Sequence, residues 1–262
     1  MEMNGFMGGL YRITEWIMRF SVTNVLWVIC SAPFFFFGLS LLTAENTDQI
    51  RSVIILMAAV APFTFFPATT AMFSVVRKWI MGQEDAPLLR TYFRGFKENY
   101  VQSLIGGLLY TVIYAVMILN FQFYSDQSNL SGILAIMFLV FMVVLGISAF
   151  HFFSMLSHMY MSTIQILKNS VLITIGRPLT SIMLALSAGA VLYISFYQFP
   201  FLIPFFMGSL IAYMAFWYFY RVYQKALDIQ KQKEEEEASV DEEDQDMLDR
   251  AESELTEESS KK

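Results

Sequence analysis

The chain has 262 residues, of which 56% are hydrophobic and 15% are charged, and its formal net charge is −6. A soluble domain usually carries about 25% charged residues because water must wet its surface, so this composition excludes an ordinary soluble domain and indicates a membrane protein. A single cysteine, Cys30, excludes an internal disulfide and a thiolate metal cluster.

Residues 1–19 are predicted to form a short amphipathic helix that lies in the membrane interface. Phe6, Leu10, Ile13 and Ile17 recur at helical spacing, and charged side chains gather on the opposite side of the same helix. The alternative is that this segment simply extends the first membrane span.

Six uncharged apolar runs follow, and each is long enough to cross a hydrocarbon core, which takes about 20 helical residues. The runs are residues 20–42, 52–76, 103–125, 132–156, 179–199 and 201–220. The last two are predicted to form a hairpin, because one helix from Pro178 to Tyr220 would be about 64 Å long. Residues 20–227 are therefore predicted to form an all-α, polytopic membrane bundle of about six transmembrane helices.

The basic residues predict the orientation of these spans. Sixteen of the seventeen Lys and Arg residues fall on one side of the membrane, and only Arg51 falls on the other. Because Lys- and Arg-rich loops stay in the cytoplasm, we predict that both the N-terminus and the C-terminus are cytoplasmic.

The connection formed by residues 77–102 interleaves basic with aromatic side chains. One interpretation is contact with an anionic lipid surface together with control of topology. The other is docking of a cytoplasmic partner, with aromatic anchors and with arginines for specificity. We do not expect a nucleic acid, because the segment is short and tethered at the bilayer. The candidate partner-binding residues are Arg77, Lys78, Trp79, Arg94, Phe96, Lys97, Asn99, Lys168 and Asn169.

Two features inside the spans could carry chemistry. His151, Ser154 and His158 share one helix face, which we interpret as a set of interhelical hydrogen bonds. A metal site or a proton relay is the alternative, but no third ligand is visible nearby. Pro62 and Pro67 are predicted to break the second span, either as a kinked packing helix or as a transporter binding site.

The spans contain no charged side chain, which argues against a proton pump or a carboxylate-driven antiporter. No phosphate loop, nucleophile elbow or zinc-protease signature appears, so we predict that the chain is not an enzyme and uses no cofactor and no metal. The tail, residues 228–262, holds five basic and fifteen acidic residues. It repels itself and is predicted to be a disordered cytoplasmic segment.

Three short motifs resemble one family. Residues 66–73 (FPATTAMF) with 75–79 (VVRKW), residues 93–103 (FRGFKENYVQS) and residues 167–170 (LKNS) are similar to elements of the YesL-like bacterial membrane proteins. The likeness covers about residues 5–225. It implies a domain of unknown function in the bacterial plasma membrane.

Members of that family are often encoded beside carbohydrate uptake systems of the ATP-binding-cassette (ABC) type and beside polysaccharide-degrading enzymes. The resemblance therefore implies a non-enzymatic accessory subunit or partner of an oligosaccharide uptake system, in contact with its membrane or ATPase subunits. The alternative is a small transporter or channel that acts on its own.

Overall fold

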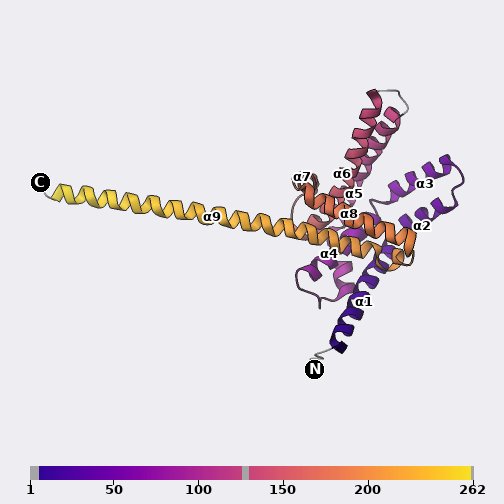
Figure 1. Cartoon of the computed structure of the whole chain (residues 1–262), viewed down its shortest axis with the longest axis horizontal. Coiled ribbons are helices and arrows are strands. Elements are labelled where there is room, and N and C mark those ends of the chain that lie inside the picture. The colour runs from indigo at the N-terminus through magenta and orange to yellow at the C-terminus, as the bar shows by residue number, and fades with distance from the viewer. Residues whose placement is uncertain (1–5, 126–129, 261–262) are drawn as a thin grey trace. The chain divides into compact units, whose positions relative to one another are not determined.

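The computed structural model describes residues 6–125 and 130–260, which are helical almost throughout and contain no strand. The chain divides into two compact units, Met1–Phe219 and Tyr220–Lys262. The α-helices are α1 (Phe6–Cys30), α2 (Ala32–Ser40), α3 (Thr47–Val60), α4 (Phe65–Ile80), α5 (Leu88–Ser125), α6 (Leu130–His158), α7 (Thr163–Gly176), α8 (Pro178–Tyr193) and α9 (Gly208–Ser260) (Figure 1). The short helices are η1 (Leu41–Thr43), η2 (Ile194–Gln198) and η3 (Ile203–Met207).

The predicted all-α membrane bundle is confirmed. Within the described ranges, five helices are long and apolar enough to cross a membrane, or six if the bent pair α3 and α4 forms one span. On α6, the outward side chains Ile133, Ile136, Val140 and Val143 are more than half exposed, which suits contact with lipid. The chain is thus a multi-pass membrane protein.

The first predicted boundary, between residues 19 and 20, falls inside a continuous helix. A single helix, α1, covers Phe6–Cys30, so the residues assigned to a separate interfacial helix are continuous with the first span. The span ends earlier than predicted, at Cys30 rather than at residue 42, because the chain bends at Ser31 and α2 starts anew at Ala32. Pro33 lies in the first turn of α2, where its missing N–H is tolerated, but in the interior of a longer helix it would remove a hydrogen bond. Contact of the first turns of α1 with the membrane surface stays a prediction.

The second apolar run is bent rather than straight. Helix α3 ends at Val60, α4 begins at Phe65, and the two helices meet at an angle of 56°. Pro62 lies in this break, and Pro67 lies in the first turn of α4. Helix α3 returns along α2, whereas α4 enters the centre of the unit (Figure 1).

Helix α4 is the core of the first unit. Every side chain from Pro67 to Val76 is buried, and the helix packs against α1, α5 and α6. Hydroxyl groups tie it to its neighbours: the Nε1–H group of Trp27 donates to Oγ1 of Thr69 (2.9 Å), and Oγ of Ser103 donates to Oγ1 of Thr70 (2.8 Å). The family-like stretch 66–79 therefore builds the centre of the bundle.

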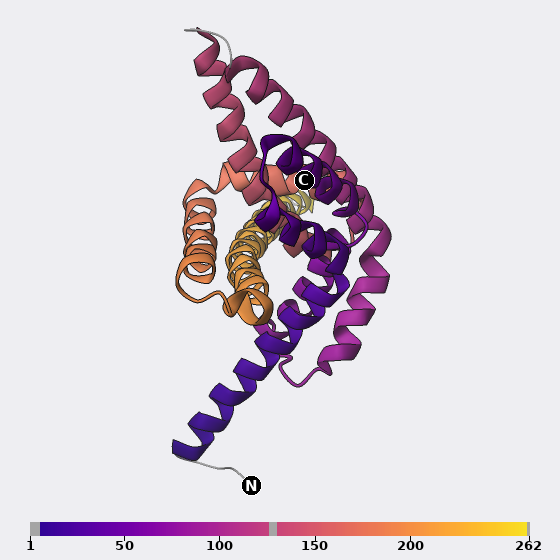
Figure 2. The ribbon, with the colours of Figure 1, turned by 90° about the vertical axis from the view of Figure 1, so that its right-hand side faces the viewer.

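Helices α5 and α6 form a long antiparallel pair that both ribbon views show side by side (Figures 1 and 2). Helix α5 has 38 residues and is about 57 Å long, which exceeds the hydrocarbon thickness of roughly 30 Å. It begins at Leu88, so most of the connection predicted over residues 77–102 is helix rather than loop. Helix α7 was not predicted, although Ser162 and Gln165 form a capping box at its start.

The last two spans are separate helices, α8 and α9, as the hairpin prediction required. The turn between them is flanked by two π-helical segments, η2 and η3. Asn24 of α1 supplies hydrogen-bond partners to the irregular backbone beside Pro204. Its Nδ2–H group donates to the Ile203 carbonyl (2.9 Å), and its Oδ1 accepts from the Ser209 N–H group (3.0 Å). Irregular backbone inside a membrane needs such internal partners.

The second unit is the continuation of α9 from Tyr220. The helix runs through Ser260, and every described side chain from Gln224 to Ala238 is exposed. A helix that buries nothing draws its stability from local propensity alone, and that stability is marginal in water. Disorder of the acidic tail in solution therefore stays a prediction.

Candidate functional site

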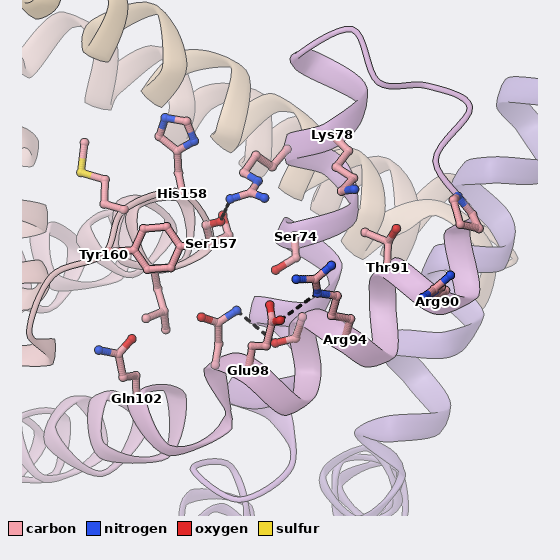
Figure 3. A pocket seen from close by; sticks show the side chains of 16 residues that line it. Ser74, Lys78, Arg90, Thr91, Arg94, Glu98, Gln102, Ser157, His158 and Tyr160 are labelled. Atoms are coloured by element: carbon pink, nitrogen blue, oxygen red, sulfur yellow. Dashed lines mark hydrogen bonds and ion pairs between the residues drawn. The ribbon is translucent and has the colours of Figure 1, made fainter.

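A cavity of about 650 Å³ lies where α4, α5 and the end of α6 meet (Figure 3). Its lining residues fall within 74–78 of α4, within 87–102 at the start of α5, and within 156–160 at the end of α6. In Figure 3, Lys78 and Arg94 face Tyr160 across the opening. We call this cavity the basic pocket.

The charge of the lining is strongly positive. Four cationic side chains, Arg77, Lys78, Arg90 and Arg94, line the pocket, whereas Glu98 is the one carboxylate among the lining residues described. Such a concentration of one sign in a concave site focuses the electrostatic field and attracts anions.

Arg77 joins two walls of the pocket. Its Nη1–H group donates to the Ser157 carbonyl at the end of α6 (2.6 Å). Its Nε atom is buried and, within the described part of the chain, has no hydrogen-bond partner. Because buried N–H groups are normally bonded, this guanidinium can take a further acceptor.

Arg94 pairs with Glu98 one turn along α5, with Nε and Oε1 2.7 Å apart. Both side chains are more than half exposed, and exposed pairs of this kind contribute little to stability because water screens them. The pair can therefore open to let Arg94 bind another anion.

Close packing positions the floor of the pocket. A Cβ atom on Gly95 would lie 2.6 Å from Cβ of Ser74, so α4 and α5 approach each other here as far as glycine permits. Further along α5, the Nδ2–H group of Asn99 donates to the Gly95 carbonyl (3.0 Å), and the Nε2–H group of Gln102 donates to the Met161 carbonyl (2.9 Å). The second bond fixes the segment after α6 against α5.

Helix α1 reaches the same end of the first unit. Arg19 is nearly buried, donates to the Glu84 carbonyl between α4 and α5, and pairs with Glu15 (2.5 Å). Its guanidinium also lies 3.8 Å from the Asp85 carboxylate. Basic residues of two segments that are distant in sequence, α1 and the α4–α5 region, thus gather at one end, as expected if that end faces the cytoplasm.

The structure separates the nine predicted partner-binding residues. Arg77, Lys78, Arg94 and Asn99 line the basic pocket. Trp79 lies in the core instead, because it packs edge-on against Trp16 with ring centroids 5.6 Å apart.

The remaining four residues lie outside the pocket. Phe96 is half-buried against Tyr100, Lys97 and Lys168 are exposed, and Asn169 contacts the sulfur of Met161. The sequence interpretation missed Arg90 and Tyr160. Arg90, Arg94, Glu98 and Gln102 recur every fourth residue, a signal that becomes readable once α5 is known to start at Leu88.

The polar residues of α6 divide between two environments. His158 lines the basic pocket, whereas His151 is fully buried deeper in the bundle, and neither of its ring nitrogens has a partner among the residues described. Ser154 bonds a carbonyl of its own helix. Ser148, one turn before His151, joins α6 to α5 instead, because its Oγ lies 2.9 Å from the Tyr110 hydroxyl. The described residues hold no group of three side chains that could bind a metal ion.

Comparison with known proteins finds sequences that are similar to these elements. A family model described as a protein of unknown function, DUF624, matches residues 20–121, which include α4 and the α5 wall of the pocket. The chain is 29% identical to the uncharacterized protein YteU of Bacillus subtilis (strain 168) over 81% of this chain and 84% of that protein. It is 28% identical to the uncharacterized protein YesL of the same organism over 78% of this chain and 84% of YesL. No solved structure matches the chain.

Proposed function

We propose that this chain, whose resemblance to the YesL-like family is confirmed, is a non-enzymatic accessory protein of the bacterial plasma membrane. In this proposal it is a subunit or partner of an ABC-type oligosaccharide uptake system. The observation that carries the binding role is the basic pocket at the end of the bundle where the Lys and Arg residues gather. The carbohydrate system is supported by the family resemblance alone.

The pocket is suited to binding rather than to coupled transport. Its cations stand at one end of the helices, not within the apolar spans, where a charged group would be expected in a proton- or ion-coupled carrier. The exposed side chains of Arg90 and Arg94 on its rim can contact an acidic surface of a partner subunit. Docking there leaves the lipid-facing sides of α5 and α6 free for contact with partner spans.

Purification from the native host in a gentle detergent tests the proposal. We expect membrane or ATPase subunits of a sugar transporter to co-purify with the wild-type chain. Reversal of charge on the rim (Arg90→Glu with Arg94→Glu) should reduce their recovery at least tenfold, since each reversed rim charge replaces an attraction with a repulsion. Arg51→Glu, which changes the one basic residue predicted on the other side, is the matched control and should leave recovery unchanged. A chain that always elutes without transporter subunits would refute the assignment.

A second function, transport by the chain itself, is favoured by one observation. The bundle contains two irregular membrane segments, the α3–α4 break and the η2–η3 turn that Asn24 supports. Discontinuous helices of this kind often line the binding sites of transporters. Reconstitution into liposomes decides between the two functions: sugar or ion flux through the pure chain would favour transport, and its absence across a panel of both would remove this alternative.

A further inference from the structure

We infer that the basic pocket is a binding site for a phosphate-bearing anion, supplied either by a soluble organic phosphate or by a phospholipid headgroup. The inference goes beyond the accessory role, because it concerns a ligand of the isolated chain. It rests on the charge of one cavity, on the hydrogen-bond donors that line it and on its size.

The charge of the pocket calls for more than one negative charge on the ligand. Four cations against the single carboxylate of Glu98 leave an excess that a monocarboxylate would not balance. A phosphate monoester carries about −1.5 to −2 charges at neutral pH and offers three strong acceptor oxygens. It therefore offsets more of this excess charge than a monocarboxylate would, and it offers more acceptors to the guanidinium groups.

Three of the four cations are arginines, whose planar forks suit phosphate oxygens. Arg77 is already oriented by its bond to the Ser157 carbonyl and keeps a buried Nε–H group without a partner in the described chain. Arg94, on the α5 side of the pocket, is held by an exposed pair that a stronger anion can replace. A phosphate group between these two arginines would satisfy both guanidinium groups.

The size and the remaining lining indicate a small ligand. A volume of about 650 Å³ falls in the range of roughly 300–1,000 Å³ that is usual for small-molecule sites. Hydroxyl and amide side chains, those of Ser74, Thr91, Asn99 and Gln102, complete the wall and suit a ligand whose non-phosphate part bears hydroxyl groups. Glycerol phosphate, free or as part of a lipid, has this chemistry.

The test uses the full chain, purified and delipidated in a neutral detergent at fixed ionic strength. Calorimetric titration with inorganic phosphate and with sn-glycerol 3-phosphate measures the soluble arm. Native mass spectrometry of the chain from nanodiscs of phosphatidylcholine with phosphatidic acid measures the lipid arm. We expect saturable binding in at least one arm, and weakening of at least tenfold in the double variant Arg90→Gln, Arg94→Gln. Lys97→Gln, on the same helix but outside the pocket, should bind as the wild type does.

The outcomes separate the two sources. Binding of the soluble probes that the double variant weakens assigns a free phosphate, and retention of phosphatidic acid alone, lost in the same variant, assigns a headgroup. Absence of binding in both arms, or binding that both variants leave equal, overturns the inference. Because the chain is tested alone, this result is independent of whether transporter subunits co-purify.

Discussion

Replacement of Gly107 by valine is expected to lower the free energy of unfolding by about 3 kcal/mol, the upper part of the range for overpacked cores. A Cβ atom at this position would lie 2.8 Å from Cα of Pro62 and 2.8 Å from Cγ of Phe66. Pro62 contributes backbone, which cannot rotate away, so α5 would have to move off the α3–α4 break. That movement would also disturb the close contact of α4 with α5 beneath the basic pocket.

Thermal denaturation of the detergent-solubilised chain, followed by fluorescence or by size-exclusion recovery, measures this effect. By the usual scaling for chains of this size, the midpoint should fall by roughly 6–12 °C. Gly189→Val on α8 is the matched control, because a Cβ atom there meets nothing within 4 Å. Equal midpoints for Gly107→Val and Gly189→Val would show that the α5–α4 contact is looser than described.

The second large effect is expected for Asn24→Leu. Leucine keeps the approximate volume but removes both hydrogen bonds, so the Ile203 carbonyl and the Ser209 N–H group would be left unsatisfied within the bundle. Each buried group without a partner costs about 1–3 kcal/mol, and for the two groups we therefore expect a loss of about 2–6 kcal/mol in unfolding free energy. The loss should be local at first, with α8 and the start of α9 separating from α1.

Proteolysis at increasing temperature, with mass spectrometry of the fragments, locates the change. Cleavage near the turn between α8 and α9 should appear in Asn24→Leu before the rest of the bundle opens. Asn120→Leu is the control, because the Asn120 side chain bonds a carbonyl of its own helix. If Asn24→Leu resists protease as well as the control, the η3 turn does not depend on α1.

The sequence predicted the membrane class and most of the spans. An uncharged apolar run that is long enough to cross the hydrocarbon core is stable only in contact with lipid, so such runs can be read from the sequence alone. The prediction divided α1 at residue 19, where the amphipathic pattern gives way to an apolar run, whereas the helix continues to Cys30 and ends at the bend at Ser31. It also treated residues 77–102 as a loop, because charged side chains interrupt the apolar pattern there although the backbone remains helical from Leu88.

The candidate site was predictable in part. Arg77, Lys78, Arg94 and Asn99 stand out as polar residues next to apolar spans, and the structure brings these four together. Trp79 follows these basic residues directly and was therefore expected at the surface, but it is buried because α1 packs over it. Arg90 and the residues after α6 could not be assigned to the same site without knowledge that α4, α5 and α6 meet at one end.

The orientation of the bundle is the premise of the proposed accessory role, because the pocket must face the cytoplasm to meet an ATPase subunit, and cysteine accessibility tests it most directly. With Cys30 replaced by serine, Glu84→Cys reports the pocket end and Glu45→Cys reports the opposite loop; both glutamates are exposed. A membrane-impermeant maleimide added to spheroplasts should label the Glu45→Cys variant at once and the Glu84→Cys variant only after permeabilisation. Labelling of the Glu84→Cys variant in sealed spheroplasts, with the Glu45→Cys variant protected, would place the basic pocket outside the cell and contradict the account.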